Sequence, residues 1–279
     1  METFPIRVSE RTVWLVIRLA TDGGVTGLGE CSLGARVDTA DLDTALALVQ
    51  GKPVNVNAFR DQAFPLARER GLACATAVSA VEMALWDILG KQANLPVHKL
   101  LGGRVHQTLP VYANINRRTK PRDPAGFAAS AAAAHAAGFR AFKAAPFDGF
   151  PPASADAADI ETATDAGIAA MVAIRDAVGP EAAVKVDCHS YFDTARAIDV
   201  ARRLEPVNLD WFEEPVPASD VESTRGINAS VKQRMAGGEL GFGLEAFKPL
   251  CDERAVDVIM PDVMHCGGIL EFTHIARYA

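Results

Sequence analysis

Acidic residues recur at one position of a repeating pattern in the second half of the chain. Asp187, Glu213, Glu239 and Asp262 each follow a short apolar run typical of a buried strand. The first three are evenly spaced, since 26 residues separate each from the next. Three carboxylates that converge on one point repel each other unless a cation lies between them. Ligands with oxygen atoms alone favour a hard ion, so the pattern indicates a Mg²⁺ site.

Each acid, taken alone, also has an ordinary structural explanation. It could cap a neighbouring helix or pair with a lysine or arginine. The even spacing favours the metal site, because one strand–helix unit of an eight-stranded barrel runs about 30 residues. Acids one unit apart would lie at equivalent ends of adjacent strands. Because each acid follows its apolar run, that end is the C-terminal one, where barrel enzymes carry their chemistry.

The elements that must position these acids alternate between strands and helices. We expect strands at 108–116, 139–143, 182–187, 208–215, 233–239 and 255–262, with helical segments between them. Such alternation predicts a parallel sheet with helical crossovers. No glycine-rich dinucleotide fingerprint accompanies it, which favours a barrel over a doubly wound sheet. The sequence therefore predicts a partial (β/α) barrel of the TIM type with six strands over residues 109–279.

Residues 1–108 have a different pattern, which predicts an α+β domain. A hairpin is expected from runs at 13–19 and 25–30 around a TDGG turn, followed by helices from about 39 to 104. Ser79 and Glu82 have the spacing of a capping box, for a helix that begins there. Trp86 and Trp211 lie in apolar patterns and are expected in the core.

Composition restricts the class of protein. Hydrophobic residues make up 49% and charged residues 23% of the 279, as in ordinary globular proteins. A net charge of −7 argues against a nucleic-acid partner. No apolar run of membrane-spanning length and no signal-peptide pattern is present in the sequence, which argues against a membrane partner. The five cysteines are odd in number and far apart, which favours reduced thiols and a cytoplasmic location.

Six stretches carry a resemblance to a known family. They are SAVEMALWDILGK, GFRAFKAAPFD, VKVDCH, WFEEP, AGGE and IMPDVMHCGG, in that order. With them the chain resembles the enolase superfamily, in its mandelate racemase/muconate lactonizing enzyme branch. The resemblance covers most of the chain from about residue 75, and GLGE with the helices before residue 104 looks like the N-terminal capping domain of that family.

The resemblance implies a chemistry as well as a fold. It implies Mg²⁺ held by Asp187, Glu213 and Glu239, and a small carboxylate substrate that chelates the metal. A proton would be removed from the carbon next to the carboxylate, and the divalent ion would stabilise the resulting enediolate. Lys143 is expected to face the substrate carboxylate or to polarise the enediolate.

Two departures from common family patterns point to the reaction type. Many relatives carry a KxK motif, of which Lys143 is present while Ala145 replaces the second lysine, the usual base. Its absence counts against a racemase with two bases. Asp187-Cys188-His189 resembles the DxH of the acid-sugar dehydratases, in which the histidine acts on the departing hydroxyl. An imidazole is suited to donate that proton near neutral pH.

Other residues are given supporting parts. Asp262 matches the aspartate that orients a histidine of a seventh strand, and the C-terminal strands of the barrel are missing from this chain. About 60 further residues would complete eight strands. We expect the open edges to be covered by self-association into a homo-oligomer. Glu214 and His265 are expected near the site without binding the metal, and the loops 31–38 and 50–60 are expected to select the substrate.

The preferred function is therefore Mg²⁺-dependent removal of water from an acid sugar or related hydroxy acid, which makes the protein a lyase. One alternative is a racemase or epimerase of a carboxylate on the same scaffold. Another is a truncated fragment that binds metal without turnover.

Overall fold

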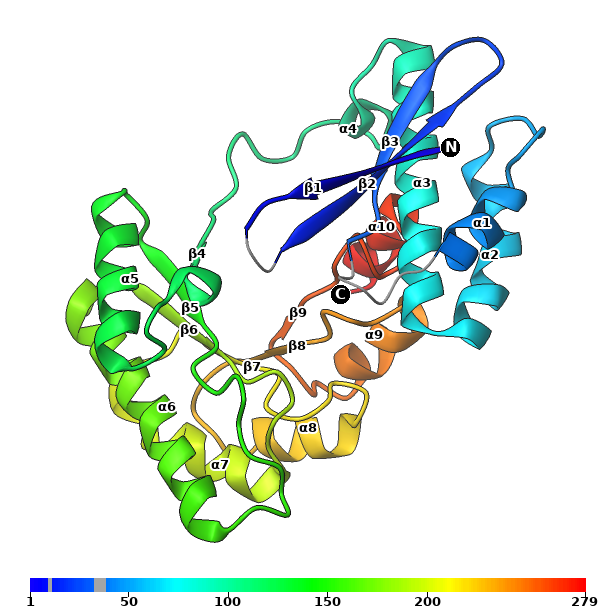
Figure 1. Ribbon diagram of the computed structural model, residues 1–279. Helices are drawn as coiled ribbons and strands as arrows, with labels where there is room; N and C mark the ends of the chain where they lie inside the picture. Colours follow the sequence, from blue (N-terminus) through cyan, green and yellow to red (C-terminus); the bar gives the residue numbers. More distant parts are fainter. Residues whose placement is uncertain (10–11, 33–38) are drawn as a thin grey trace. The chain divides into compact units, whose positions relative to one another are not determined.

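The computed structural model describes residues 1–9, 12–32 and 39–279 (Figure 1). Contacts divide the chain into two compact units. Unit 1 comprises Met1–Gln107, Glu239–Lys248 and Pro261–Ala279, and unit 2 comprises Thr108–Gly238 and Pro249–Met260. The sequence predicts two contiguous domains that meet at 108/109. In the structure two late segments belong to the first unit, in which Glu82 of the helix Leu72–Ala93 accepts the N–H groups of Ile269 and Leu270.

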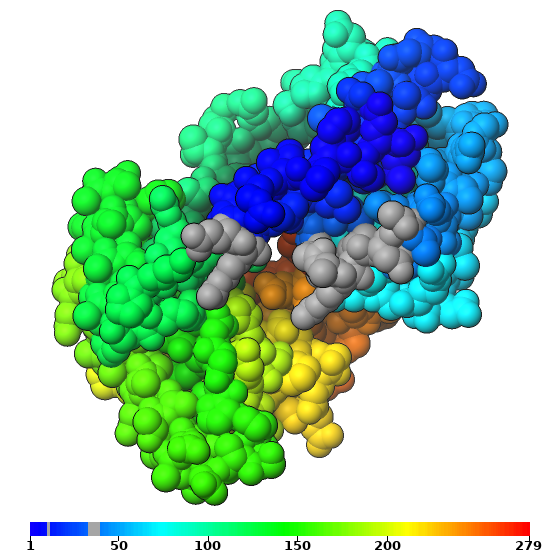
Figure 2. Space-filling model, viewed as in Figure 1, coloured from blue at the N-terminus to red at the C-terminus, as the bar shows by residue number. Residues whose placement is uncertain are grey.

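Unit 1 contains a three-stranded antiparallel sheet in the order β1-β2-β3 and a group of helices. Its elements are β1 (Glu2–Arg7), β2 (Val13–Ala20), β3 (Thr26–Glu30), α1 (Thr39–Ala47), α2 (Val56–Arg70), α3 (Leu72–Ala93), α4 (Val97–Leu100) and α10 (Ile269–Tyr278). The predicted hairpin corresponds to β2 and β3. Strand β1 was not predicted, because all six of its residues are exposed and no buried face marks it in the sequence. Figure 2 shows this strand, in dark blue, at the surface.

Helix α3 is the centre of unit 1. It is long and apolar enough to cross a membrane, yet 67% of its apolar window is buried within the protein, as in a core helix. Val78, Val81 and Leu85 belong to the cluster of buried residues that also includes Ile17 and Leu19 of β2. The helix begins at Leu72 rather than at Ser79, so the predicted capping box is wrong. Ser79 and Glu82 instead bind the chain around the start of α10.

The glycines of the GLGE stretch allow β3 to lie directly on α3. A Cβ built on Gly29 would be 1.9 Å from the carbonyl oxygen of Ala80, and one on Gly27 would be 2.1 Å from that of Ala84. These distances leave no room for a methyl group, and the obstacle in each case is helix backbone. Small residues on both elements therefore set the spacing between sheet and helix.

We expect Gly29→Ala to destabilise the protein by about 3 kcal/mol, because overpacking against backbone costs at the upper end of the usual 1–3 kcal/mol range. Gly23→Ala is the matched control, since a Cβ there meets its nearest atom at 3.9 Å. Chemical denaturation of both variants measures the difference. Equal stability of the two would show that β3 can move away from α3 at little cost.

Unit 2 is built on a six-stranded parallel sheet in the order β4-β5-β6-β7-β8-β9. The strands are β4 (Ala113–Asn114), β5 (Ala141–Ala144), β6 (Ala183–Asp187), β7 (Trp211–Glu213), β8 (Met235–Gly237) and β9 (Val258–Ile259). Each falls within one of the six predicted ranges, except that β5 extends one residue beyond its range, to Ala144. The predicted parallel sheet with helical crossovers is thus confirmed, and within the described residues β4 and β9 form its two edges, so the barrel is not closed.

Helices follow the strands of unit 2 in alternation. They are α5 (Pro124–Ala136), α6 (Ala157–Val178), α7 (Thr194–Arg203) and α8 (Val221–Asn228), with short 3₁₀ turns η1 (Asn116–Arg118) and η2 (Glu205–Val207). Figure 1 shows α5 to α8 on one face of the sheet. Helix α9 (Leu244–Asp252) is divided between the units after Lys248.

Candidate functional site

The register of the sheet brings two of the predicted acids side by side. Asp187, the last residue of β6, pairs with Glu213, the last residue of β7. The prediction that these acids occupy equivalent ends of adjacent strands is therefore confirmed. It is wrong for Glu239, because the residue level with Glu213 on β8 is Ala236. The crossover from β7 to β8 is shorter than that from β6 to β7, so equal spacing in sequence did not give equal register.

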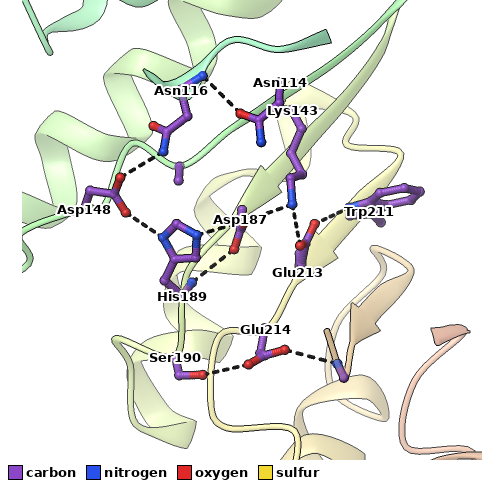
Figure 3. Close-up of polar contacts among 12 residues, drawn as sticks. Asn114, Asn116, Lys143, Asp148, Asp187, His189, Ser190, Trp211, Glu213 and Glu214 are labelled. Atoms are coloured by element: carbon purple, nitrogen blue, oxygen red, sulfur yellow. Dashed lines mark hydrogen bonds and ion pairs between the residues drawn. The ribbon is translucent and has the colours of Figure 1, made fainter. Parts of the chain in front are cut away.

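The ammonium of Lys143 lies between the two carboxylates. Its Nζ is 2.9 Å from Asp187 Oδ2 and 2.6 Å from Glu213 Oε1, and all three side chains are almost fully buried (Figure 3). Lys143 reaches them from β5, in which it is the third residue. The two carboxylates thus converge on one point, and the Lys143 ammonium occupies that point.

Burial and charge shift the pKa values of these groups in different directions. Burial alone would lower the pKa of the Lys143 ammonium, but the carboxylates of Glu213 and Asp187 outweigh it and raise that pKa. Burial and the nearby Asp187 charge raise the pKa of Glu213. Burial also acts to raise the pKa of Asp187, but hydrogen bonds from His189 and Lys143 prevail and lower it. The two carboxylates thus share one ammonium group.

An unusual backbone turn after β6 places His189 in contact with this cluster. After β6 ends at Asp187, His189 and Ser190 both have left-handed φ angles, of 46° and 58°. Non-glycine residues adopt this region rarely, and such backbone is typical of functional sites. The His189 N–H donates to Asp187 Oδ1 at 3.2 Å and its ring Nε2 lies 3.2 Å from Asp187 Oδ2. The predicted DxH pair is therefore in direct contact.

The other ring nitrogen of His189 contacts a residue that the sequence analysis did not single out. Nδ1 lies 2.6 Å from Asp148 Oδ1, and Asp148 follows β5 in the loop 145–150 (Figure 3). Hydrogen bonds to Asp148 and Asp187 raise the pKa of His189 to about 10, although burial opposes them. The only sequence signal is an acid soon after a barrel strand, which by itself does not identify its partner.

Glu214 supports two loops instead of facing the acids. Its backbone has a left-handed φ of 40°, which turns it away from the path of β7. Ser190 Oγ donates to its Oε1 at 3.2 Å, and the N–H of Gly238 donates to its Oε2 at 3.1 Å. Glu214 thus fixes the backbone next to His189 and the residue that immediately precedes Glu239. Its expected supporting role stays a prediction that these contacts favour.

Trp211 does more than fill the core. It is only half-buried, and its indole N–H donates to Glu213 Oε2 at 2.9 Å. The buried Lys185 lies 4.5 Å above the Trp211 ring and pairs with Asp210 at 2.6 Å. The sequence pattern missed this function because apolar spacing does not reveal where an indole N–H points. One carboxylate oxygen of Glu213 therefore contacts Lys143, and the other accepts the hydrogen bond from Trp211.

The remaining predicted site residues lie in unit 1. Asp262 closes a turn by accepting the N–H of Met264 on Oδ1 at 2.8 Å. His265 is buried and its Nδ1 lies 2.9 Å from Thr76 Oγ1 of α3, so it contacts core helix. Glu239, two residues beyond β8, is half-buried. Over residues 1–9, 12–32 and 39–279, no group of three or more acidic, histidine or cysteine side chains is gathered closely enough to hold a metal ion. The metal assignment stays a prediction.

One predicted substrate-selecting loop falls largely outside the described residues. Positions 33–38 of the loop 31–38 are not described. The second predicted loop, 50–60, includes the first residues of α2, whose N-cap Asn55 accepts the N–H of Ala58 at 3.0 Å.

Family comparisons match nearly the whole chain. Residues 126–279 match the enolase C-terminal domain-like family, and residues 2–102 match the mandelate racemase/muconate lactonizing enzyme N-terminal domain. The boundary between the two matches lies near the one that the contacts draw after Gln107.

Relatives of known name are enzymes of sugar acids. D-gluconate dehydratase of Thermoproteus tenax is 31% identical over 95% of this chain and 53% of its own length. D-galactarolactone cycloisomerase of Agrobacterium fabrum is 29% identical over 97% of this chain and 69% of its own length. D-galactonate dehydratase of Ralstonia pickettii is 30% identical over 95% of this chain and 68% of its own length. The chain thus spans about half the length of the first of these relatives and about two thirds of the others.

A solved structure with similar fold carries bound small molecules. It is an enolase from Agrobacterium radiobacter with bound sodium and L-malate, at a TM-score of 0.84 and 27% identity over 100% of this chain and 70% of that one. Two family matches that together cover most of the chain, and a relative 30% identical over two thirds of its length, agree with the fold. The chain therefore belongs to the enolase superfamily, in its mandelate racemase/muconate lactonizing enzyme branch.

Proposed function

We propose that this chain is the catalytic part of a Mg²⁺-dependent dehydratase that removes water from an acid sugar or a related hydroxy acid. The observation that carries the proposal is the contact of His189 with Asp187, next to the point where Asp187 and Glu213 converge on a cation. In this proposal, His189 is a proton donor that lies beside the cation site. The dehydratase names of two relatives support the same reaction type.

The residues present fit a divalent cation. Asp187 and Glu213 offer buried carboxylate oxygens, and the position of the Lys143 ammonium between them supports the proposal that the pair stabilises positive charge. We propose Glu239 as the third ligand, on the family resemblance. When bound, Mg²⁺ would stabilise the negative charge that develops on the substrate carboxylate as the neighbouring carbon loses its proton.

Each residue of the cluster then has a defined part. The Lys143 ammonium would add positive charge beside the substrate carboxylate. His189 would donate its proton to the β-hydroxyl, so that the C–O bond breaks and water leaves. The enol so formed becomes a 2-keto-3-deoxy acid by taking up one proton at carbon. Asp262 would orient a histidine base, as the resemblance implies.

The racemase alternative receives less support from the site. Residue 145, where a second lysine would stand, is a buried alanine that carries no base. One relative is named a cycloisomerase rather than a dehydratase, so its name indicates a different reaction. A cytoplasmic location and a homo-oligomeric state stay predictions.

The direct test is to incubate the purified protein and Mg²⁺ with D-gluconate and with D-galactonate in deuterated water. Proton NMR reports exchange at the α-carbon, and a semicarbazide assay reports 2-keto acid. The dehydratase proposal requires 2-keto acid to accumulate. Epimerised or cyclised product without 2-keto acid would replace it with one of the alternatives, and metal binding without any turnover would favour the non-catalytic fragment.

Mg²⁺ is expected to raise the thermal unfolding midpoint of the protein, and Glu213→Gln is expected to lose most of this gain. The physical reason is that a ligand bound only to the folded state stabilises it, by about 2.7 kcal/mol at 100 times its Kd. Differential scanning fluorimetry over a Mg²⁺ or Mn²⁺ series measures the shift. Glu222→Gln, an exposed change of the same type on α8, is the control. Equal gains in both variants would exclude Glu213 as a ligand.

A further inference from the structure

The carboxylate of Asp148 is surrounded by hydrogen-bond donors. Its Oδ1 lies 2.6 Å from His189 Nδ1, while its Oδ2 accepts from Asn116 Nδ2 at 2.9 Å and from Arg122 Nη2 at 3.1 Å. Figure 3 shows this chain of contacts running from Asn116 through Asp148 to His189. Because both oxygens have partners, the carboxylate cannot rotate without breaking one of these contacts. Its orientation toward the imidazole is therefore fixed.

An aromatic cluster holds the two loops that carry Asp148 and His189. The ring of Phe147, next to Asp148, lies 5.0 Å from that of Phe192, which follows His189 by three residues, and Phe150 lies 5.1 Å from Phe192. Phe147 is buried against Gly167 of α6, where a Cβ would be only 2.1 Å from its ring. The loop after β5 is thus anchored to the loop after β6, and the contact between Asp148 and His189 rests on packed side chains.

The imidazole consequently lies between two carboxylates, with Nδ1 toward Asp148 and Nε2 toward Asp187. We propose that Asp148 is a positioning residue: it holds His189 by Nδ1, so that Nε2 is the nitrogen directed to the cation site and to the departing hydroxyl. This inference rests on the proposed dehydratase function. In this inference Asp148 does not touch the substrate. It acts through His189, whose ring contacts Asp148 by one nitrogen and Asp187 by the other.

The proposal predicts a specific kinetic result. Asp148→Ala removes the acceptor of Nδ1 and so releases the ring. Misplacing a catalytic group by about 1 Å costs about 10² in rate. We expect kcat for dehydration of D-galactonate or D-gluconate to fall about 10²-fold, while KM and α-hydrogen exchange with deuterated water stay near the wild-type values. Asp148→Glu should recover part of the loss.

A second measurement needs no substrate. An imidazole N–H held at short distance by a carboxylate gives a slowly exchanging, downfield proton resonance, which His189→Asn assigns by its disappearance. The resonance should vanish in Asp148→Ala and persist in Asp156→Asn. The control makes the same charge change at an exposed residue that precedes α6 and has no side-chain cap hydrogen bond.

The outcomes separate this inference from the proposed function. If the resonance persists in Asp148→Ala, or if that variant keeps wild-type kcat, Asp148 does not position His189, whatever the reaction is. If Asp148→Ala loses exchange and dehydration together, Asp148 serves the site as a whole and the positioning role is overturned. If the wild type dehydrates neither acid sugar but the resonance depends on Asp148, the proposed function fails and the contact between the two residues stands.

Discussion

In a protein that includes the seventh-strand histidine implied by the resemblance as base, His189→Asn should lose dehydration by about 10²–10⁴-fold and still exchange the α-hydrogen of the substrate with deuterated water. A single general acid typically contributes a factor of this size. The asparagine cannot protonate the leaving hydroxyl, but Asp187, Glu213 and Lys143 are unchanged, so the cluster that we propose to bind the carboxylate is retained. Formation of 2-keto acid and loss of the α-proton signal by NMR measure the two steps separately.

His106→Asn is the control, because His106 is exposed and lies in unit 1, outside the cluster. Loss of exchange together with dehydration, with Mg²⁺ binding intact, would make His189 the base that removes the α-proton. A variant as active as the control would make His189 a structural residue. In that case the dehydratase proposal would lose the observation that carries it.

Glu82→Ala should cost about 3–5 kcal/mol of stability, the largest structural effect that we expect in unit 1. The buried carboxylate of Glu82, on α3, accepts the N–H groups of Ile269 at 2.6 Å and Leu270 at 2.9 Å, which are the first two residues of α10. It also accepts the indole N–H of Trp86 at 2.7 Å. Three partly buried donors would lose their acceptor, and each unsatisfied buried group costs about 1–3 kcal/mol.

The start of α10 is shaped around this carboxylate. Gly268, its N-cap, has a left-handed φ of 89°, and a Cβ there would lie 2.1 Å from Glu82 Oε2. Chemical denaturation followed by circular dichroism measures the loss, with the exposed Gln92→Ala on the same helix as control. A loss no greater than that of the control would show that water replaces the carboxylate at the helix terminus.

The same carboxylate makes stability depend on pH. Burial raises the pKa of Glu82 from 4.5 to about 7, although its hydrogen bonds oppose the shift. Between these values the folded protein holds a proton that the unfolded chain has released. The contribution of Glu82 to stability therefore falls as pH rises from about 4.5 to 7. Glu82→Gln cannot titrate, so the difference between it and wild type should change over that range and be constant below it.

Local pattern was sufficient for the architecture of unit 2. The six strands fall where apolar runs alternate with helical segments, because burial on both faces of a parallel sheet requires such runs. The pairing of Asp187 with Glu213 also followed from sequence, since both acids end their strands and adjacent parallel strands share a register. The exposed β1 gave no comparable signal. Equal spacing in sequence predicted the wrong register for Glu239, because the crossover from β7 to β8 is shorter than the one before it.

The sequence by itself thus determined which residues end the strands of the sheet, and with them the acids and the lysine that could bind a cation and a carboxylate. Tertiary structure decided the partners of those residues. Asp148 meets His189 only because the phenylalanines pack two loops together, and Glu82 caps a helix 187 residues away only because α10 packs on α3. The physical reason is that strand ends follow from local burial patterns. A hydrogen bond between distant segments instead depends on tertiary packing, which the spacing of residues along the sequence does not reveal.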